Sequence, residues 1–156
     1  MQLTMERRLK ATLARATAGL SPIALGAAWS DWALHLVSAP GKQLELLEKA
    51  GRKARRLGNY ANHCANACAT TEASCTAGNP DICIAPLPQD RRFEDESWQK
   101  WPFNLMYQGF LLNQQWWHNA TTGVAGVTRQ HEDVVEFAAR QMLDVFSPSN
   151  FALTNP

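Results

Sequence analysis

No segment of this chain of 156 residues alternates apolar and polar residues in the way that a half-buried β-strand requires. Apolar residues recur instead at intervals of three and four positions, the spacing that places them on one face of an α-helix. Hydrophobic residues make up 46% of the chain and charged residues 19%, which is enough apolar material to form a core. We therefore expect a mainly α fold with helices in two parts joined by a loop.

The first half of the sequence predicts three helices. The segment 4–18 carries Leu9 and Leu13 as its apolar row. Ser21 and Pro22 begin a second helix, since serine is a good N-cap and proline is tolerated at the first helical position. Its apolar stripe comprises Leu25, Trp29, Trp32 and Leu36. After the break at Pro40 and Gly41, a third helix is predicted from about 42 to about 67, with an apolar row of Leu44, Leu47, Ala50, Ala54 and Leu57.

The second half differs in composition and predicts two further helices. Residues 70–89 are rich in Thr, Ser, Gly, Asn and Pro and are predicted to be a linker. A helix over 103–117 has apolar residues on more than one face, so it is buried on several sides or docks on another body. Thr128 is the expected N-cap of a last helix that ends near Phe146. The apolar row predicted for that helix comprises Val135, Ala138, Met142 and Val145.

The near-neutral net charge of +1 hides two segments of opposite sign. Residues 1–57 carry ten Lys or Arg against four Asp or Glu, whereas residues 58–156 carry five against ten. Five of the basic residues crowd the third helix: Lys49, Arg52, Lys53, Arg55 and Arg56. This cluster is either a solvated face or a surface for an anionic or amphiphilic body. Nucleic acid is not an expected partner, because no aromatic residues interleave the basic ones.

The cysteines, Cys64, Cys68, Cys75 and Cys83, leave several interpretations open. Their spacing fits no common zinc signature, and an even number permits two disulfides in an oxidising compartment. In the cytoplasm, four reduced thiols are the expected state. We expect no bound metal and no cofactor. No apolar run is long enough for a transmembrane helix, and polar interruptions argue against a signal peptide near the N-terminus.

Catalytic motifs are absent from the sequence. A hydrolase-type nucleophile elbow needs glycines around a Ser or Cys, and none of the four cysteines has such flanks. A Cys–His pair with His35, His118 or His131 remains conceivable from sequence alone. The acidic runs at 94–96 and 132–133 lie near helix starts, where the helix dipole explains them without catalysis. We therefore assign no catalytic residue to this chain.

Motifs distributed through the second half resemble one family. They are Pro88-Gln89-Asp90-Arg91-Arg92-Phe93, Trp98 with Trp101-Pro102-Phe103, Gln114-Gln115-Trp116-Trp117-His118-Asn119-Ala120-Thr121, Ala139-Arg140-Gln141, Ser147-Pro148-Ser149-Asn150-Phe151 and Leu153-Thr154-Asn155-Pro156. They resemble the N-terminal region of poly(3-hydroxyalkanoate) synthases, also called polyhydroxybutyrate polymerases, of the short-chain-length, single-subunit type. The first half, including Leu57-Gly58-Asn59-Tyr60, is similar to the leader region of the same proteins.

The resemblance implies a larger enzyme than this chain contains. The family joins (R)-3-hydroxyacyl-CoA thioesters into polyester through a Cys–His–Asp triad in an α/β-hydrolase domain. That domain follows the Thr-Asn-Pro motif, so we expect this chain to be the non-catalytic front part of such an enzyme, inactive alone. The implied organisation is a basic helical leader over 1–69, the linker over 70–89 and the helical N-terminal domain over 90–156.

The resemblance also implies partners, which are the enzyme's own catalytic domain, a second copy in a homodimer, and the polyester granule or its phasin-like coat protein. We expect a cytoplasmic, granule-associated protein. The candidate granule-binding residues are Lys49, Arg52, Lys53, Arg55 and Arg56. The candidate docking interface comprises Phe103, Phe110, Trp116 and Trp117. The alternative is a free-standing helical adaptor that binds granules or their coat and never catalyses.

Overall fold

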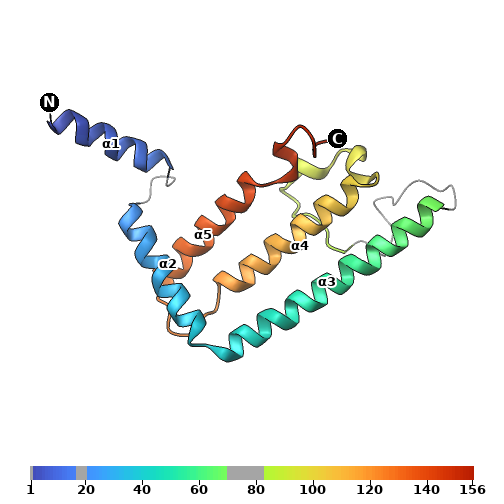
Figure 1. Ribbon diagram of the computed structural model, residues 1–156, viewed down its shortest axis with the longest axis horizontal. Helices are drawn as coiled ribbons and strands as arrows, with labels where there is room; N and C mark the ends of the chain where they lie inside the picture. The colour runs from blue at the N-terminus through green and yellow to red at the C-terminus, as the bar shows by residue number, and fades with distance from the viewer. Residues whose placement is uncertain (1, 17–20, 70–82) are drawn as a thin grey trace.

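The structure, a computed structural model, describes residues 2–16, 21–69 and 83–156 (Figure 1). The side chains of residues 1–3, 9, 13–20 and 66–82 are not described. Five α-helices make up most of these residues: α1 (Gln2–Ala16), α2 (Pro22–Val37), α3 (Pro40–Ala69), α4 (Phe103–Thr121) and α5 (Arg129–Val145). Short 3-10 turns lie at Arg91–Phe93, Glu96–Gln99 and Pro148–Asn150. No strand occurs in the part of the chain described, so the predicted mainly α class is confirmed.

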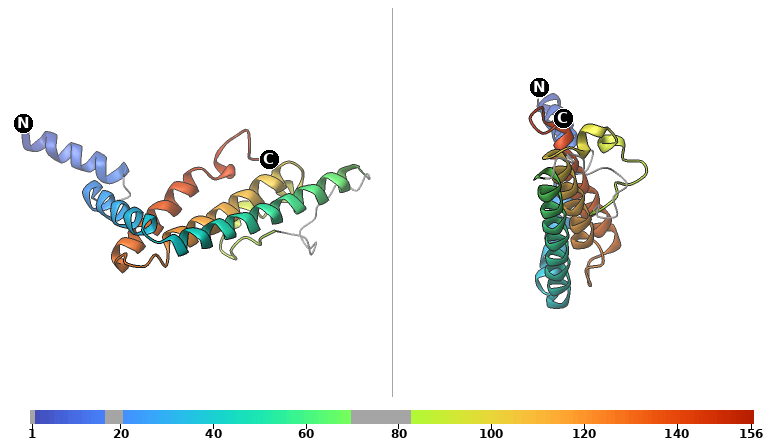
Figure 2. Two further views of the ribbon diagram at one scale, coloured as in Figure 1. Left: turned by 60° about the horizontal axis from the view of Figure 1, so that its bottom comes forward. Right: turned by 90° about the vertical axis from the view of Figure 1, so that its right-hand side faces the viewer.

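Three helices lie side by side and alternate in direction. In Figures 1 and 2, α4 lies between α3 and α5, and α2 crosses the end of this layer where α5 begins. The α1 helix lies beyond α2, away from the layer. Because α3 packs on α4 and α2 packs on α5, the segments before and after 70–89 share one packed assembly. The division of the sequence into a leader, a linker and a second domain stays a prediction.

The central position of α4 explains why apolar residues cover more than one of its faces. Phe93, Trp98, Tyr107, Phe110 and Leu111 form one buried cluster, in which the Phe93 ring lies 4.9 Å from the Trp98 ring and 5.5 Å from the Tyr107 ring. Tyr60, Cys64, Cys83 and Leu112 form a second cluster, on the side of α3. Of the two alternatives for this helix, burial on several sides is the one found.

The segment that leads into α4 is held by a buried glutamine. The Gln108 side chain is fully buried; its Oε1 accepts from the Ile84 backbone N–H and its Nε2 donates to the Ile84 carbonyl, each at 2.9 Å. One amide thus replaces the pairing that a neighbouring strand would give this backbone. The described part of the predicted linker, residues 83–89, is therefore packed against α4, whereas 70–82 lie outside the described residues.

The apolar row predicted for α3 is wrong at Leu44, Leu47 and Ala54, which are exposed. Leu44 and Leu47 are 62% and 68% exposed, while Leu46, Tyr60 and Cys64 are buried. Leu46 and Lys53 lie on the side that faces α4, since the Trp116 indole N–H donates to the Leu46 carbonyl and Lys53 binds Gln115. Both faces of α3 carry apolar residues, so periodicity alone could not identify the buried one.

The row predicted for α5 is wrong in its second half. Val135 and Ala139 are buried, but Met142 is 58% exposed and Val145 is 63% exposed. The α5 helix packs on α2 and α4 from one side, and Phe137 and Phe146 are exposed like Met142 and Val145. The predicted cap is confirmed, because the Thr128 hydroxyl accepts from the His131 backbone N–H. The predicted Leu9 and Leu13 row of the first helix falls on side chains that are not described.

Candidate functional site

The five basic residues predicted on α3 divide into two groups. Three of them bind within the chain: Lys49 donates to Asn119 Oδ1 at 2.6 Å, Lys53 donates to Gln115, and Arg56 donates to the Cys83 carbonyl. Lys49 also forms an ion pair with Glu45 at 2.5 Å. These bonds join α3 to α4 and to the segment ahead of α4. Partial burial is the main cause of a lowered pKa for Lys53. The nearby positive charges of Arg56, Lys49 and Arg52 lower this pKa further.

The other two basic residues lie on the outward face of α3. Arg52 pairs only with Glu48 of its own helix at 3.5 Å, and Arg55 donates only to the Gly51 carbonyl at 3.4 Å. Both side chains are exposed. We define the outward face of α3 as Leu44, Leu47, Gly51, Arg52, Ala54, Arg55 and Gly58, all of which are exposed. Two large apolar side chains and two arginines thus share one exposed side of a long helix.

The four aromatic residues predicted as a docking interface do not lie on one surface. Phe110 is 9% exposed and belongs to the buried cluster, and Phe103 packs against that cluster at its edge. The Trp116 indole N–H donates to the Leu46 carbonyl at 3.1 Å, so this ring lies against α3. Trp117 lines a cleft on the other side of α4. Phe110 is covered within the chain, because several elements surround α4; a docking role for the others stays a prediction.

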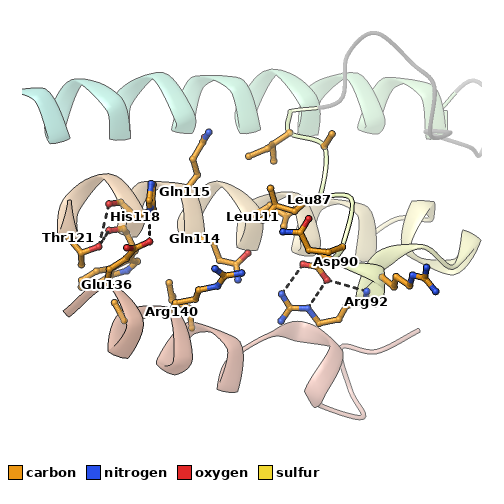
Figure 3. Close-up of a pocket in the computed structure, with 17 residues that line it drawn as sticks. Leu87, Asp90, Arg92, Leu111, Gln114, Gln115, His118, Thr121, Glu136 and Arg140 are labelled. Carbon is orange, nitrogen blue, oxygen red and sulfur yellow. Dashed lines mark hydrogen bonds and ion pairs between the residues drawn. The ribbon is translucent and has the colours of Figure 1, made fainter. Parts of the chain in front are cut away.

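That cleft lies between α4, α5 and residues 84–92 and has a volume of about 810 Å³ (Figure 3). Its apolar walls are formed by Ile84, Leu87, Leu111, Trp117, Ala139 and Leu143. Its polar lining includes Asp90, Arg92, Gln114, His118, Glu136 and Arg140. Figure 3 shows the Arg140 side chain rising from α5 between the two helices.

Most charged groups of the cleft are paired with a neighbouring charged group. Arg92 donates to both Asp90 oxygens at 2.8 Å and to Asp144 Oδ1 at 2.9 Å. These hydrogen bonds to Arg92 lower the pKa of Asp90, and the bond to Asp90 is the main cause of a raised pKa for Arg92. The His118 ring lies 2.9 Å from Glu136 Oε1. Arg140 forms no ion pair or hydrogen bond with any residue that the structure describes.

A second polar contact fixes the start of α5 against α2. Asp31 Oδ2 lies 2.6 Å from His131 Nδ1, and Asp31 Oδ1 lies 3.1 Å from His35 Nδ1. The hydrogen bond with His131 is the main cause of a lowered pKa for Asp31. The Trp32 indole N–H also crosses to α4, where it donates to the Ala120 carbonyl at 3.0 Å. These histidines therefore have structural partners in the bundle.

Two stretches of the chain match one family. Residues 89–156 match the family described as the poly-beta-hydroxybutyrate polymerase (PhaC) N-terminus, and residues 2–42 match the one described as poly-beta-hydroxybutyrate polymerase N terminal. The chain belongs to the poly(3-hydroxyalkanoate) polymerase family. It corresponds to the N-terminal region of such a polymerase, as the sequence motifs indicated.

Curated relatives match the chain over about half its length. A poly(3-hydroxyalkanoate) polymerase from Methylorubrum extorquens is 36% identical over 74 residues, 47% of this chain. A poly(3-hydroxyalkanoate) polymerase subunit PhaC from Rhizobium etli is 33% identical over 78 residues, 46% of this chain. The matched segment covers only 12% of the length of each relative. No solved structure matches the chain.

In this polymerase region, the cleft lies mostly within a segment that matches the family, whereas the outward face of α3 does not. All cleft residues from Gln89 onward lie in the matched segment 89–156, whereas the outward face lies between the two matches. Sequence reasoning did not identify the cleft. Two signals for the cleft were available in the sequence: the polar Gln114 within an apolar helix, and Arg140 between Ala139 and Leu143. Which residues of α4 and α5 face each other depends on how the two helices pack, and the sequence does not show that.

The cysteines of the polymerase region are in two states. Cys64 is disulfide-bonded, so the expectation of four reduced thiols is wrong for Cys64. Cys83 is a free, buried thiol, and burial is the main cause of its raised pKa. Cys68 and Cys75 are not described. Among the described residues, no three His, Cys, Asp or Glu side chains lie where they could hold a metal ion.

None of the described helices combines the length and the apolar character that crossing a membrane requires.

Proposed function

We propose that this N-terminal region attaches a polyester-forming polymerase to the surface of polyester granules through the outward face of α3. The observation that carries the proposal is that Leu44 and Leu47 are exposed beside Arg52 and Arg55. A helix with exposed apolar residues flanked by cations binds interfaces between water and an amphiphilic body. The cationic partners of the apolar residues are Arg52 and Arg55 alone, since Lys49, Lys53 and Arg56 are held within the chain.

A granule with an anionic coat fits this face better than a single folded protein does. The face is a stripe along one side of a 30-residue helix, with open space beside Gly51 and Gly58. Burial of Leu44 and Leu47 in the granule surface supplies attraction at any salt concentration. The arginines add attraction that falls with ionic strength, because the screening length is about 8 Å at 0.15 M.

Sedimentation with purified granules tests this proposal. The parent chain is expected to sediment with granules, less so at high salt. Arg52→Gln with Arg55→Gln should reduce binding and flatten its salt dependence, whereas Leu44→Ser with Leu47→Ser should reduce binding at every salt concentration. Equal sedimentation of all three proteins would overturn the proposal.

We further propose that the exposed side of α5 supports the catalytic domain of the polymerase, directly or within a homodimer. Phe137, Met142 and Val145 of this helix and Phe146 at its C-cap are exposed apolar residues. Large exposed apolar patches commonly mark protein interfaces. Replacement of Met142 and Val145 by Ser should lower the activity of the whole polymerase, or its dimer fraction, without changing granule sedimentation. Unchanged activity and unchanged oligomeric state would contradict this role.

A further inference from the structure

The walls of the cleft are largely apolar, although several charged residues also line it. Leu87 and Trp117 contribute from the leading segment and α4, and Leu143 contributes from α5. Its volume of about 810 Å³ lies within the range of roughly 300–1,000 Å³ typical of pockets for small ligands. Such walls with a few polar groups favour an elongated, largely apolar ligand.

The charges of the cleft favour an anionic end on that ligand. Asp90 is paired with Arg92 and Glu136 with His118, so neither carboxylate is without a partner. Arg140 is the lining arginine that forms no hydrogen bond or close ion pair with the described residues; its charge acts on Asp90 only from a greater distance, and it reaches between α4 and α5 (Figure 3). Arg91, the remaining cation of the lining, is 83% exposed and lies 4.0 Å from Glu94. One guanidinium whose N–H donors are not engaged by the described residues, beside apolar walls, suits a monoanionic amphiphile rather than a phosphate, which needs several donors.

We infer that this cleft binds the carboxylate end of a single 3-hydroxyalkanoate oligomer, with the carboxylate at Arg140 and the chain along Leu87, Trp117 and Leu143. The choice of ligand rests on the proposed role in a polyester-forming polymerase, since the curated relatives are named for 3-hydroxyalkanoate polymers. Such an oligomer combines short aliphatic groups, which the walls accept, with one terminal carboxylate. A guanidinium binds a carboxylate with two parallel N–H donors.

The site is distinct from the outward face of α3, because the cleft lies on the α5 side of α4 while α3 lies on the other side. Binding of a free chain end in the cleft and attachment to a granule surface can therefore be separated by mutation. Arg140 and Leu87 are exposed residues without internal side-chain bonds, so their replacement should leave the fold intact.

The probe is the free-acid trimer of (R)-3-hydroxybutyrate, titrated calorimetrically into the 156-residue chain. We expect saturable binding to one site. Arg140→Gln should weaken it about tenfold, the effect of losing roughly 1.4 kcal/mol from a charged hydrogen bond. Leu87→Ser should weaken it about threefold. The matched controls Arg55→Gln and Leu47→Ser, on the outward face of α3, should bind the trimer like the parent chain.

Two further ligands identify what the cleft recognises. The methyl ester of the trimer lacks the carboxylate, so it should bind about tenfold more weakly than the acid and should not respond to Arg140→Gln. Decanoate has the carboxylate but no ester groups, and it should also bind more weakly than the trimer. Equal affinity for decanoate would overturn the polyester assignment in favour of a general site for acyl chains.

Absence of saturable trimer binding, or equal losses in all four variants, would overturn the inference. Granule sedimentation of the same variants distinguishes this failure from failure of the proposed function. Arg55→Gln and Leu47→Ser should reduce sedimentation, and Arg140→Gln and Leu87→Ser should not. A chain that sediments in this pattern yet binds no trimer retains the proposed function without the cleft site.

Discussion

Arg92 Nη1 donates to Asp144 Oδ1 at 2.9 Å and thereby joins the segment ahead of α4 to the last turn of α5. The same guanidinium lies 5.6 Å and 5.7 Å from the centres of the Phe93 and Phe110 rings. Its side chain is 33% exposed and that of Asp144 is 34% exposed, so solvent only partly screens the pair. Arg92 also lines the cleft.

Replacement of Arg92 by Gln should destabilise the chain by about 1–2 kcal/mol, because the charged hydrogen bonds that Arg92 donates to Asp90 and Asp144 are lost. Urea unfolding followed by circular dichroism measures the change. The matched control is Arg91→Gln, since Arg91 is 83% exposed and lies 4.0 Å from its partner Glu94. We expect that variant to lie within about 0.5 kcal/mol of the parent chain. An equal effect of both replacements would contradict the role assigned to Arg92.

The Asp90–Arg92 pair should make stability depend on pH in the acid range. Its hydrogen bonds with Arg92 hold the pKa of Asp90 below the ordinary value of 3.8 in the folded chain. Folding therefore favours the ionised carboxylate, and this stabilisation is complete above the unfolded pKa and is lost as the pH falls through the lower folded pKa. Asp90→Asn should reduce the free energy of unfolding at pH 7, and the difference from the parent should shrink below about pH 4. A difference that grows on acidification would refute the pairing.

Gln108→Leu should destabilise the chain by about 1–3 kcal/mol, because it leaves the Ile84 backbone N–H and carbonyl without the amide that binds both. Besides lowering the free energy of unfolding of the whole chain, the replacement should loosen the segment ahead of α4. Hydrogen exchange of residues 83–92 should accelerate more than that of α4, since this segment depends on the glutamine. Gln141→Leu, at an exposed position of α5, is the control and should change neither quantity by much. Uniform acceleration along the chain would count against a specific anchoring role.

Gly126→Ala should destabilise the chain, whereas Gly51→Ala should stabilise it. Gly126 has a φ of 94°, and a Cβ there would meet the His35 ring, so a loss of about 1–3 kcal/mol is expected. Gly51 lies within α3, where nothing lies within 4 Å of an added Cβ, and alanine there should add about 0.5–1 kcal/mol. Thermal unfolding compares the two variants with the parent. Stabilisation by Gly126→Ala would contradict the packing of α2 against the loop before α5.

The helices could be predicted from the sequence because their signals are local. Pro22 stands at the start of α2, Thr128 caps α5, and apolar spacing runs through α3 and α4. The faces of α3 and α5 could not be assigned so well. Leu47 and Leu46 are adjacent and equally apolar, yet one is exposed and the other is buried. Only the position of α4 decides between them, and that depends on contacts far apart in the sequence.

The candidate site was predictable in composition but not in geometry. The basic cluster of α3 was visible in the sequence, but the inward direction of Lys53 depends on Gln115, 62 positions later. The cleft depends on residues from α4, α5 and the leading segment that no spacing rule relates. Four aromatic residues of α4 were predicted as a docking interface, yet Phe110 is buried because several elements pack around it.

A comparison of two double variants of α3 tests the central claim, that the outward face of this helix attaches the polymerase region to granules. One variant replaces the outward pair, Arg52 and Arg55, by Gln, and the other replaces the inward pair, Lys49 and Lys53, by Gln. Both remove the same charge from the same helix, so a general charge effect would appear equally in each. The measurement is the fraction that sediments with granules at low salt, with the free energy of unfolding recorded for both proteins. We predict that the outward variant loses sedimentation and keeps its stability, whereas the inward variant keeps sedimentation and loses stability. Equal loss of sedimentation in both, or loss in the inward variant alone, would contradict the account.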